Sequence, residues 1–171
     1  MKTDLPWWYS ESLTVERSAL HLDGVALEPL ARTHGTPLYV YSRPTVQRRL
    51  RALQTTLAQV TDRFKLYYAM KSNRHAGVLA AARATLGVGI DTCSPREVEL
   101  AMASGFAPDE ISFNAGMLSN RDLVCLAETG VHCTLDSFSA LRRYGELVPA
   151  GTPIGLRFDP GVAASYGQQP K

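Results

Sequence analysis

Residues 64–71 read Phe-Lys-Leu-Tyr-Tyr-Ala-Met-Lys, an apolar, strand-forming run that ends in a lysine and is followed at once by Ser72-Asn73. This run begins a series of short β-type segments that alternate with helical patterns at a spacing of roughly twenty residues. Such alternation is typical of repeated βα units and a parallel sheet. We expect five strands, at 64–70, 88–92, 111–114, 131–135 and 154–158, with helices near 75–86, 95–104, 120–129 and 137–147.

Large apolar residues alternate with polar or small ones along these strands. Val88 and Ile90, for example, alternate with Gly89 and Asp91. A doubly wound sheet is covered by helices on both faces, and its strands are apolar throughout. Here only one face suits helices, so the other predicts a polar barrel lumen and an α/β fold, an incomplete (β/α)8 barrel of TIM type with about five βα units. The later residues on the polar or small positions are Ser112, Asn114, His132, Thr134, Asp136, Gly155 and Arg157.

The sequence upstream of the barrel predicts a separate N-terminal segment, residues 1–35, followed by barrel sequence over residues 36–171. Residues 19–27 predict a hairpin around Asp23-Gly24, and residues 27–34 a short helix that Gly35 ends. A strand is expected at 38–41, and Ser42 and Pro44 then begin a long helix. Its apolar positions form one core-facing stripe, Val46, Leu50, Leu53, Leu57 and Val60.

Composition excludes several classes of protein. The 171 residues are 45% hydrophobic and 20% charged with a net charge of +2, which is typical of a soluble globular chain. The arginines are scattered among carboxylates, and the apolar runs are too short to span a bilayer, so we expect neither a nucleic-acid nor a membrane partner. Asp4 and Pro6 interrupt the apolar stretch that a signal peptide needs, which indicates a cytoplasmic protein. Cys93, Cys125 and Cys133 lack metal-ligand spacing, so we expect reduced thiols and no metal site.

Lys71 is the strongest candidate for a functional residue. Only four of the eighteen basic residues are lysine, so lysine is not the usual surface cation of this chain. A lysine at the C-terminal end of a barrel strand points its amine into a site, where imine chemistry becomes available. The alternative is a solvated loop lysine. Lys71 shares its parity with Tyr67 and Ala69, which places it on the lumen face if Leu66, Tyr68 and Met70 face outward.

Five short motifs, in this order, resemble the fold-type III pyridoxal-phosphate enzymes, and among them the diaminopimelate decarboxylase group. They are residues 22–25 with 35–41, residues 68–73, residues 89–94 with Glu97, residues 105–106 with 111–113, and residues 156–161. The resemblance implies that Lys71 binds pyridoxal 5'-phosphate as an imine. It also implies catalytic roles for Lys71 and Asp91, and cofactor contacts for Ala69, Asp91, Glu97 and Arg157.

Several of these residues have structural alternatives. Asp91 also fits a lumen carboxylate that is hydrogen-bonded for structure, and Glu97 fits a capping box with Ser94. His132 fits a core histidine better than a catalytic one. Cys93 fits strand packing beside Asp91.

The resemblance implies pyridoxal-phosphate-dependent decarboxylation, with meso-diaminopimelate to L-lysine favoured over ornithine, arginine or a related diamino acid. A non-catalytic barrel that binds the cofactor is the alternative from another class. An alanine-racemase-like enzyme is disfavoured by the roughly sixty residues before Phe64, and a sugar-phosphate barrel by Lys71, Asp91 and Arg157.

The family pattern continues after the fifth strand with a cofactor-stacking histidine, a glycine-rich phosphate loop, an acidic partner for the pyridine nitrogen and a C-terminal β domain. These 171 residues contain none of them. We therefore expect the N-terminal portion of a longer, homodimeric enzyme that acts on a small amino acid. Residues 1–35 would then contribute to its β domain.

Overall fold

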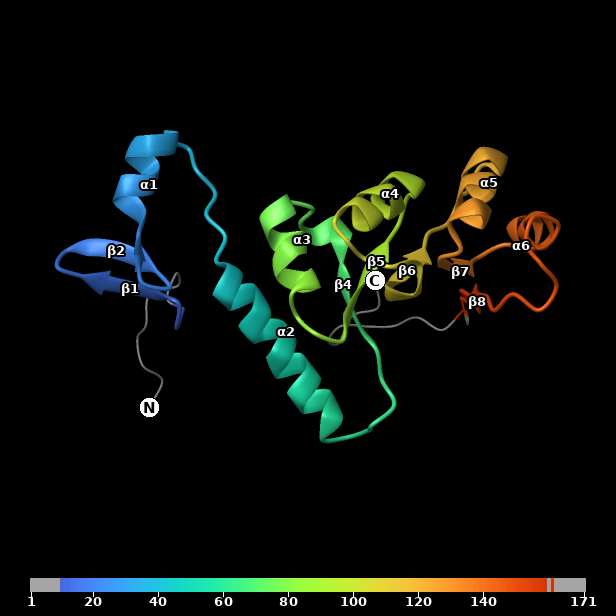
Figure 1. Ribbon diagram of the computed structural model, residues 1–171, viewed down its shortest axis with the longest axis horizontal. Coiled ribbons are helices and arrows are strands. Elements are labelled where there is room, and N and C mark those ends of the chain that lie inside the picture. Colours follow the sequence, from blue (N-terminus) through green and yellow to red (C-terminus); the bar gives the residue numbers. More distant parts are fainter. Residues whose placement is uncertain (1–9, 160, 162–171) are drawn as a thin grey trace. The chain divides into compact units, whose positions relative to one another are not determined.

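The computed structural model describes residues 10–159 and residue 161. The chain divides into two compact units, and Figure 1 labels the elements of both. The first unit contains the chain up to Phe64 together with His75–Gly87, and the second contains Lys65–Arg74 and the chain from Val88 onward. The boundary at residue 35 stays a prediction.

The first unit begins with a small antiparallel sheet in the order β1-β2-β3. The predicted hairpin around Asp23-Gly24 is confirmed, and both turn residues have positive φ angles, 46° and 78°. Strand β1 was not predicted, because its turn to β2 is formed by Arg17 and Ser18, which carry no glycine signal although both have positive φ. The elements are β1 (Leu13–Glu16), β2 (Ala19–Leu22), β3 (Val25–Ala26) and helix α1 (Leu27–His34), which Gly35 ends as predicted.

The strand predicted at residues 38–41 is wrong. These residues belong to no strand in the described part of the chain, so their β-type side chains stay largely in solvent, and Tyr39 is 85% exposed. Tyr41 instead stacks on the ring of His75, with a centroid distance of 6.4 Å. The prediction failed because a strand requires a partner, which local β propensity does not supply.

Helix α2 (Arg43–Ala58) begins where the sequence predicts, with the Ser42 side chain accepting a hydrogen bond from the Thr45 backbone at 3.1 Å. The predicted apolar stripe is only partly core, because Leu50 is buried whereas Leu53 is 52% exposed. Helix α2 packs against α3 (Ala76–Arg83), and Gln54 Nε2 of α2 donates a hydrogen bond to the Leu86 carbonyl at 2.9 Å.

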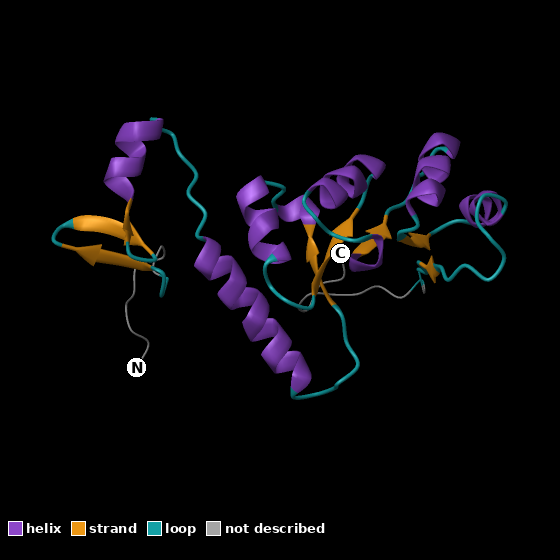
Figure 2. Ribbon diagram, viewed as in Figure 1, coloured by secondary structure: helices purple, strands orange, loops and turns teal. Residues whose placement is uncertain are grey.

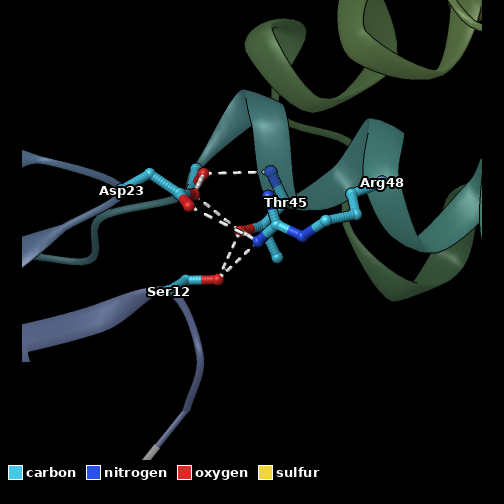
Figure 3. Close-up of polar contacts among 5 residues, drawn as sticks. Ser12, Asp23, Thr45 and Arg48 are labelled. Atoms are coloured by element: carbon cyan, nitrogen blue, oxygen red, sulfur yellow. Dashed lines mark hydrogen bonds and ion pairs between the residues drawn. The ribbon is translucent and has the colours of Figure 1, made fainter.

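A network of polar side chains ties Ser12 and the β2–β3 turn to the start of α2 (Figure 3). The carboxylate of Asp23 accepts hydrogen bonds from the hydroxyls of Ser42 and Thr45, the latter at 2.6 Å. Arg48 donates to Thr45 at 2.8 Å and to Ser12 at 2.7 Å, and it lies 3.4 Å from Asp23. Every one of these five side chains therefore has a partner within the network.

The second unit is a five-stranded parallel sheet in the order β4-β5-β6-β7-β8, with a helix after β5, β6 and β7 (Figure 2). This order confirms the predicted α/β fold of repeated βα units. Strands β4 and β8 are the two edges, so the sheet is not closed within the described residues. The strands are β4 (Leu66–Ala69), β5 (Val88–Thr92), β6 (Ile111–Asn114), β7 (His132–Leu135) and β8 (Gly155–Leu156), and the helices are α4 (Pro95–Ala103), α5 (Asn120–Thr129) and α6 (Phe138–Gly145).

Local signals in the sequence explain most of the boundaries in this unit. Ser94 and Ser119 accept hydrogen bonds from the backbone three residues later, so both predicted N-caps are confirmed. Gly130 ends α5 with a φ of 68°. Strand β8 is shorter than the predicted 154–158, because it is paired only with β7.

The predicted alternation of faces is confirmed along the central strands. Ile90, Ile111 and Phe113 are fully buried, whereas Asn114 and His132 are exposed. Gly89 is required on the opposite face from Ile90, because a Cβ there would lie 2.8 Å from the Tyr67 ring and 2.5 Å from the Glu110 carbonyl oxygen.

Candidate functional site

Strand register aligns one inward residue from each of four neighbouring strands. Ala69 is paired with Asp91, Asp91 with Ser112, and Ser112 with His132. Paired residues of a sheet point to the same face, so these four form one row. Two of the predicted cofactor residues, Ala69 and Asp91, are therefore neighbours on the polar face.

Lys71 lies on a braced turn directly after β4, the 3₁₀ turn η1 (Met70–Ser72). The Ser72 hydroxyl donates a hydrogen bond to the Ala69 carbonyl at 2.7 Å, and the Asn73 N–H donates to the Met70 carbonyl at 3.1 Å. The Tyr68 hydroxyl donates to the Asn73 carbonyl at 3.0 Å. With Met70 fully buried, these bonds hold the backbone on both sides of Lys71 while its side chain remains exposed.

The two lysines of the described residues have opposite surroundings. At the start of β4, the Lys65 amine donates a hydrogen bond to the Asp109 carbonyl at 2.5 Å and lies 5.3 Å from the centre of the Tyr67 ring. The Lys71 amine makes no hydrogen bond and no ion pair with any residue that the structure describes. Lys71 is therefore the lysine whose amine is available to a ligand.

Asp91 is a half-buried carboxyl close enough to Lys71 for their charges to interact. Burial raises the pKa of Asp91, the Lys71 ammonium lowers it, and the Glu97 carboxylate raises it again, with a net upward shift. A proton is thus held more firmly on Asp91 than on an ordinary aspartate.

Glu97 is 4% exposed, and it is the single buried Asp or Glu among the described residues. Its Oε2 accepts hydrogen bonds from the Cys93 N–H at 2.9 Å and from the Cys93 thiol at 3.2 Å. The predicted capping box is therefore half formed: Ser94 caps α4, but the Glu97 carboxylate binds one residue before the cap. Cys93 lies directly after β5 and near Asp91, and the interpretation as strand packing did not include the contact of its thiol with Glu97.

The predicted site residues are only partly brought together. Lys71, Ala69, Asp91 and Glu97 lie on β4, β5 and the adjoining η1 and α4, whereas Arg157 follows β8 at the other edge of the sheet. The Arg157 N–H donates to the Leu135 carbonyl at 2.8 Å, and the residue lines a hollow with Asp136 and Phe138. His132 is exposed, so its interpretation as a core histidine is wrong.

Three residues of this region were missed as part of the site: Tyr68, Cys93 and Ser112. The alternation of polar residues contained the signal for Ser112. No local pattern indicates the Cys93 contact, because a glutamate at the third helical position normally binds the N–H of the cap residue. Within the described residues, no group of three or more His, Cys, Asp or Glu side chains is placed to hold a metal ion.

Parallel βα units with polar side chains at the C-terminal strand ends are typical of barrel-type proteins, whose sites lie at that end of the strands. Residues 43–169 match the pyridoxal-dependent decarboxylases, in their pyridoxal binding domain. The chain belongs to this family, which confirms the resemblance inferred from its motifs.

Known relatives agree with this membership. The chain is 32% identical over 151 residues to the diaminopimelate decarboxylase of Methanothermobacter thermautotrophicus, and 35% identical over 150 residues to that of Pseudomonas fluorescens. These alignments cover 88% and 85% of the chain, but the chain spans about 35% of the length of both relatives.

Solved structures share the fold. A crystal structure of a protein from Aquifex aeolicus has a TM-score of 0.71 at 27% identity, covering 80% of this chain and 33% of that one. Diaminopimelate decarboxylase from M. jannaschii, solved with L-lysine, has a TM-score of 0.74 at 24% identity, covering 80% of this chain and 32% of that one.

Proposed function

We propose that this chain supplies the reactive lysine of a pyridoxal 5'-phosphate-dependent amino-acid decarboxylase that converts meso-diaminopimelate to L-lysine. The observation that carries the proposal is the Lys71 amine, which is exposed and unpaired on a braced turn beside Asp91. Relatives named diaminopimelate decarboxylase favour this substrate over ornithine or arginine.

The residues present fit the reactive end of the cofactor. Lys71 would hold the cofactor aldehyde through its amine, and Asp91, Ala69, Glu97 and Arg157 are our candidates for further contacts. When bound, the cofactor ring supplies a sink for the electron pair left on Cα as the carboxylate departs.

The chain's own residues would manage charge and protons. The Lys71 ammonium and the Glu97 carboxylate both act on the charge of Asp91, the first lowering and the second raising its pKa. The amine of Lys71, whenever it is not bonded to a ligand, can then accept or donate a proton at its Nζ. Because hydrogen bonds hold the backbone of the braced turn, the Nζ can change its position only through rotations of the Lys71 side chain.

Lysine labelling tests the proposal directly. The protein is expressed from its complete gene, incubated with pyridoxal 5'-phosphate and reduced with borohydride, and its peptides are mapped by mass spectrometry. We expect the label on Lys71. Lys65, which directly precedes β4, is the matched control, and a label there instead would overturn the assignment.

A substrate panel tests the reaction. Release of carbon dioxide is measured with meso-diaminopimelate, ornithine, lysine and arginine, and we expect the highest kcat/KM for meso-diaminopimelate. Binding of the cofactor without turnover of any amino acid would favour the non-catalytic alternative. We also propose a cytoplasmic homodimer without nucleic-acid or membrane partners, to be checked by cell fractionation and analytical ultracentrifugation.

A further inference from the structure

Cys93 and Glu97 are joined at one carboxylate oxygen. The Cys93 N–H and the Cys93 thiol both donate to Oε2 of Glu97, at 2.9 and 3.2 Å. The other oxygen, Oε1, accepts no hydrogen bond from any residue that the structure describes. Cys93 thus occupies one side of the carboxylate and leaves the other to water or a ligand.

The identity of residue 93 matters because Glu97 is almost completely buried. A buried carboxylate is costly unless hydrogen bonds replace its lost hydration. The N-terminus of α4 and the backbone N–H of residue 93 stabilise the Glu97 carboxylate whichever residue stands at position 93. The second hydrogen-bond donor, in contrast, is the thiol of Cys93. Burial and the neighbouring Glu97 raise the pKa of Cys93, so the thiol keeps the proton that it donates.

The charged groups facing this pair come from the elements of the candidate site. Asp91 lies on β5 and Lys71 on the turn after β4, and the charges of both act on the Cys93 thiol. The charge of Glu97 in turn acts on Asp91. The position of the Glu97 carboxylate is therefore one determinant of the charge balance around the Lys71 amine.

We propose that Cys93 is a positioning residue, whose thiol and N–H hold Oε2 of Glu97 so that the carboxylate stays fixed beside Asp91 and Lys71. The effect of Cys93 on catalysis rests on the proposed function. The hydrogen bonds between Cys93 and Glu97 do not depend on that function, so the hydrogen bonds and the catalytic effect are tested separately.

Thiol alkylation tests the pair without any enzyme assay. Iodoacetamide is added to wild type and to Glu97→Gln at several pH values, and alkylation of each cysteine is followed by peptide mapping. In the wild type we expect Cys93 to titrate above the ordinary thiol value of about 8.5. In Glu97→Gln the loss of a negative charge should speed Cys93 alkylation several-fold.

Cys125 on α5 is the internal control, and its alkylation should not change. Should Glu97→Gln fail to fold, Glu97→Asp takes its place, because its shorter side chain withdraws the carboxylate from the thiol and should also speed Cys93 alkylation. A Cys93 thiol that titrates at the ordinary value, or equal rates of Cys93 alkylation in the two folded proteins, would contradict the hydrogen bond between Cys93 and Glu97.

Activity tests the positioning role. Cys93→Val removes the donor at similar volume, whereas Cys93→Ser keeps an O–H donor. We expect Cys93→Val to lower kcat/KM about tenfold, the scale of one hydrogen bond to a charged group. The acid limb of its pH profile should move to lower pH, because a Glu97 carboxylate that is no longer held in place raises the pKa of Asp91 less.

Cys93→Ser should recover most of both properties. A purely structural role would change the melting temperature but not the pH profile. Wild-type pH profiles in both variants, or equal losses in both, would overturn the positioning role.

Discussion

Two aspartates, one in each compact unit, have opposite surroundings. Asp23 accepts hydrogen bonds from Ser42 and Thr45 and lies beside Arg48, and these contacts, Ser42 first, lower its pKa (Figure 3). For Asp91 burial is the largest influence, no hydrogen bond to its side chain is present among the described residues, and its pKa is raised.

The cations near the two aspartates also differ in how many partners they have. Arg48 donates to Ser12 and Thr45 as well as approaching Asp23, so its guanidinium is held in place. Lys71 has no such partner among the described residues. The comparison teaches that a carboxylate whose hydrogen bonds are made within the protein stabilises the fold. A half-buried carboxyl beside an unpaired amine can instead interact with a ligand.

Replacing Lys71 is the change with the largest expected effect. Lys71→Ala should lower decarboxylation by at least about 10²- to 10⁴-fold, the range for loss of an acid–base group. Lys65→Ala is the matched control and should retain turnover, because the Lys65 amine is engaged by Asp109 and Tyr67. Steady-state release of carbon dioxide measures both, and an unaffected rate in Lys71→Ala would end its central role.

The two aspartates should respond in opposite ways to the change to asparagine. Since the folded state raises the Asp91 pKa, its ionised form is disfavoured on folding above about pH 3.8. Asp91→Asn should therefore melt at the same or a higher temperature at pH 7, yet lose about 10²-fold in activity. Asp23→Asn should melt lower and keep its kinetics. A lower melting temperature with normal kinetics in Asp91→Asn would leave Asp91 only a structural role.

The brace around Lys71 predicts a smaller effect. Tyr68→Phe removes the hydroxyl that donates to the Asn73 carbonyl, which should cost about 0.5–1.5 kcal/mol of stability and lower kcat a few-fold. Tyr67→Phe is the adjacent control, since the Tyr67 hydroxyl makes no hydrogen bond to the described residues. Chemical denaturation and initial rates compare the two, and equal behaviour would contradict the brace.

The smallest effect concerns stability alone and depends on pH. Because the Asp23 pKa is lowered on folding, its charge stabilises the fold above about pH 3.8, and this contribution is lost as pH falls through the folded value. The melting temperatures of wild type and Asp23→Asn should therefore differ by a few degrees at pH 7 and begin to converge as the pH falls below about 3.8. A difference that persists at pH 2 would show that carboxylate charge is not its source.

Patterns of short range made most of the second unit predictable. Alternation at Val88–Thr92 and Ile111–Asn114 identified both strands and their faces, and Ser94 and Ser119 identified helix starts. The errors arose where strand formation depends on pairing with another strand. Residues 38–41 have β propensity but no partner, and β1 forms around a turn without glycine.

In the candidate site, too, features set by the local sequence could be predicted, and contacts made only after folding could not. The positions of Lys71, directly after β4, and of Asp91, on β5, could be predicted from the strand pattern, whereas their roles stay predictions. The thiol contact of Cys93 could not, because it depends on which N–H the Glu97 side chain reaches after folding.

The braced turn at Lys71 has a consequence for entropy. With the backbone held by Tyr68 and Ser72, only the torsions of one side chain remain for the amine to sample. Its nitrogen is confined to the volume that one lysine side chain can sweep around a fixed point. A carbonyl compound bound within that volume meets its nucleophile without a further loss of translational freedom, the advantage expressed as effective molarity.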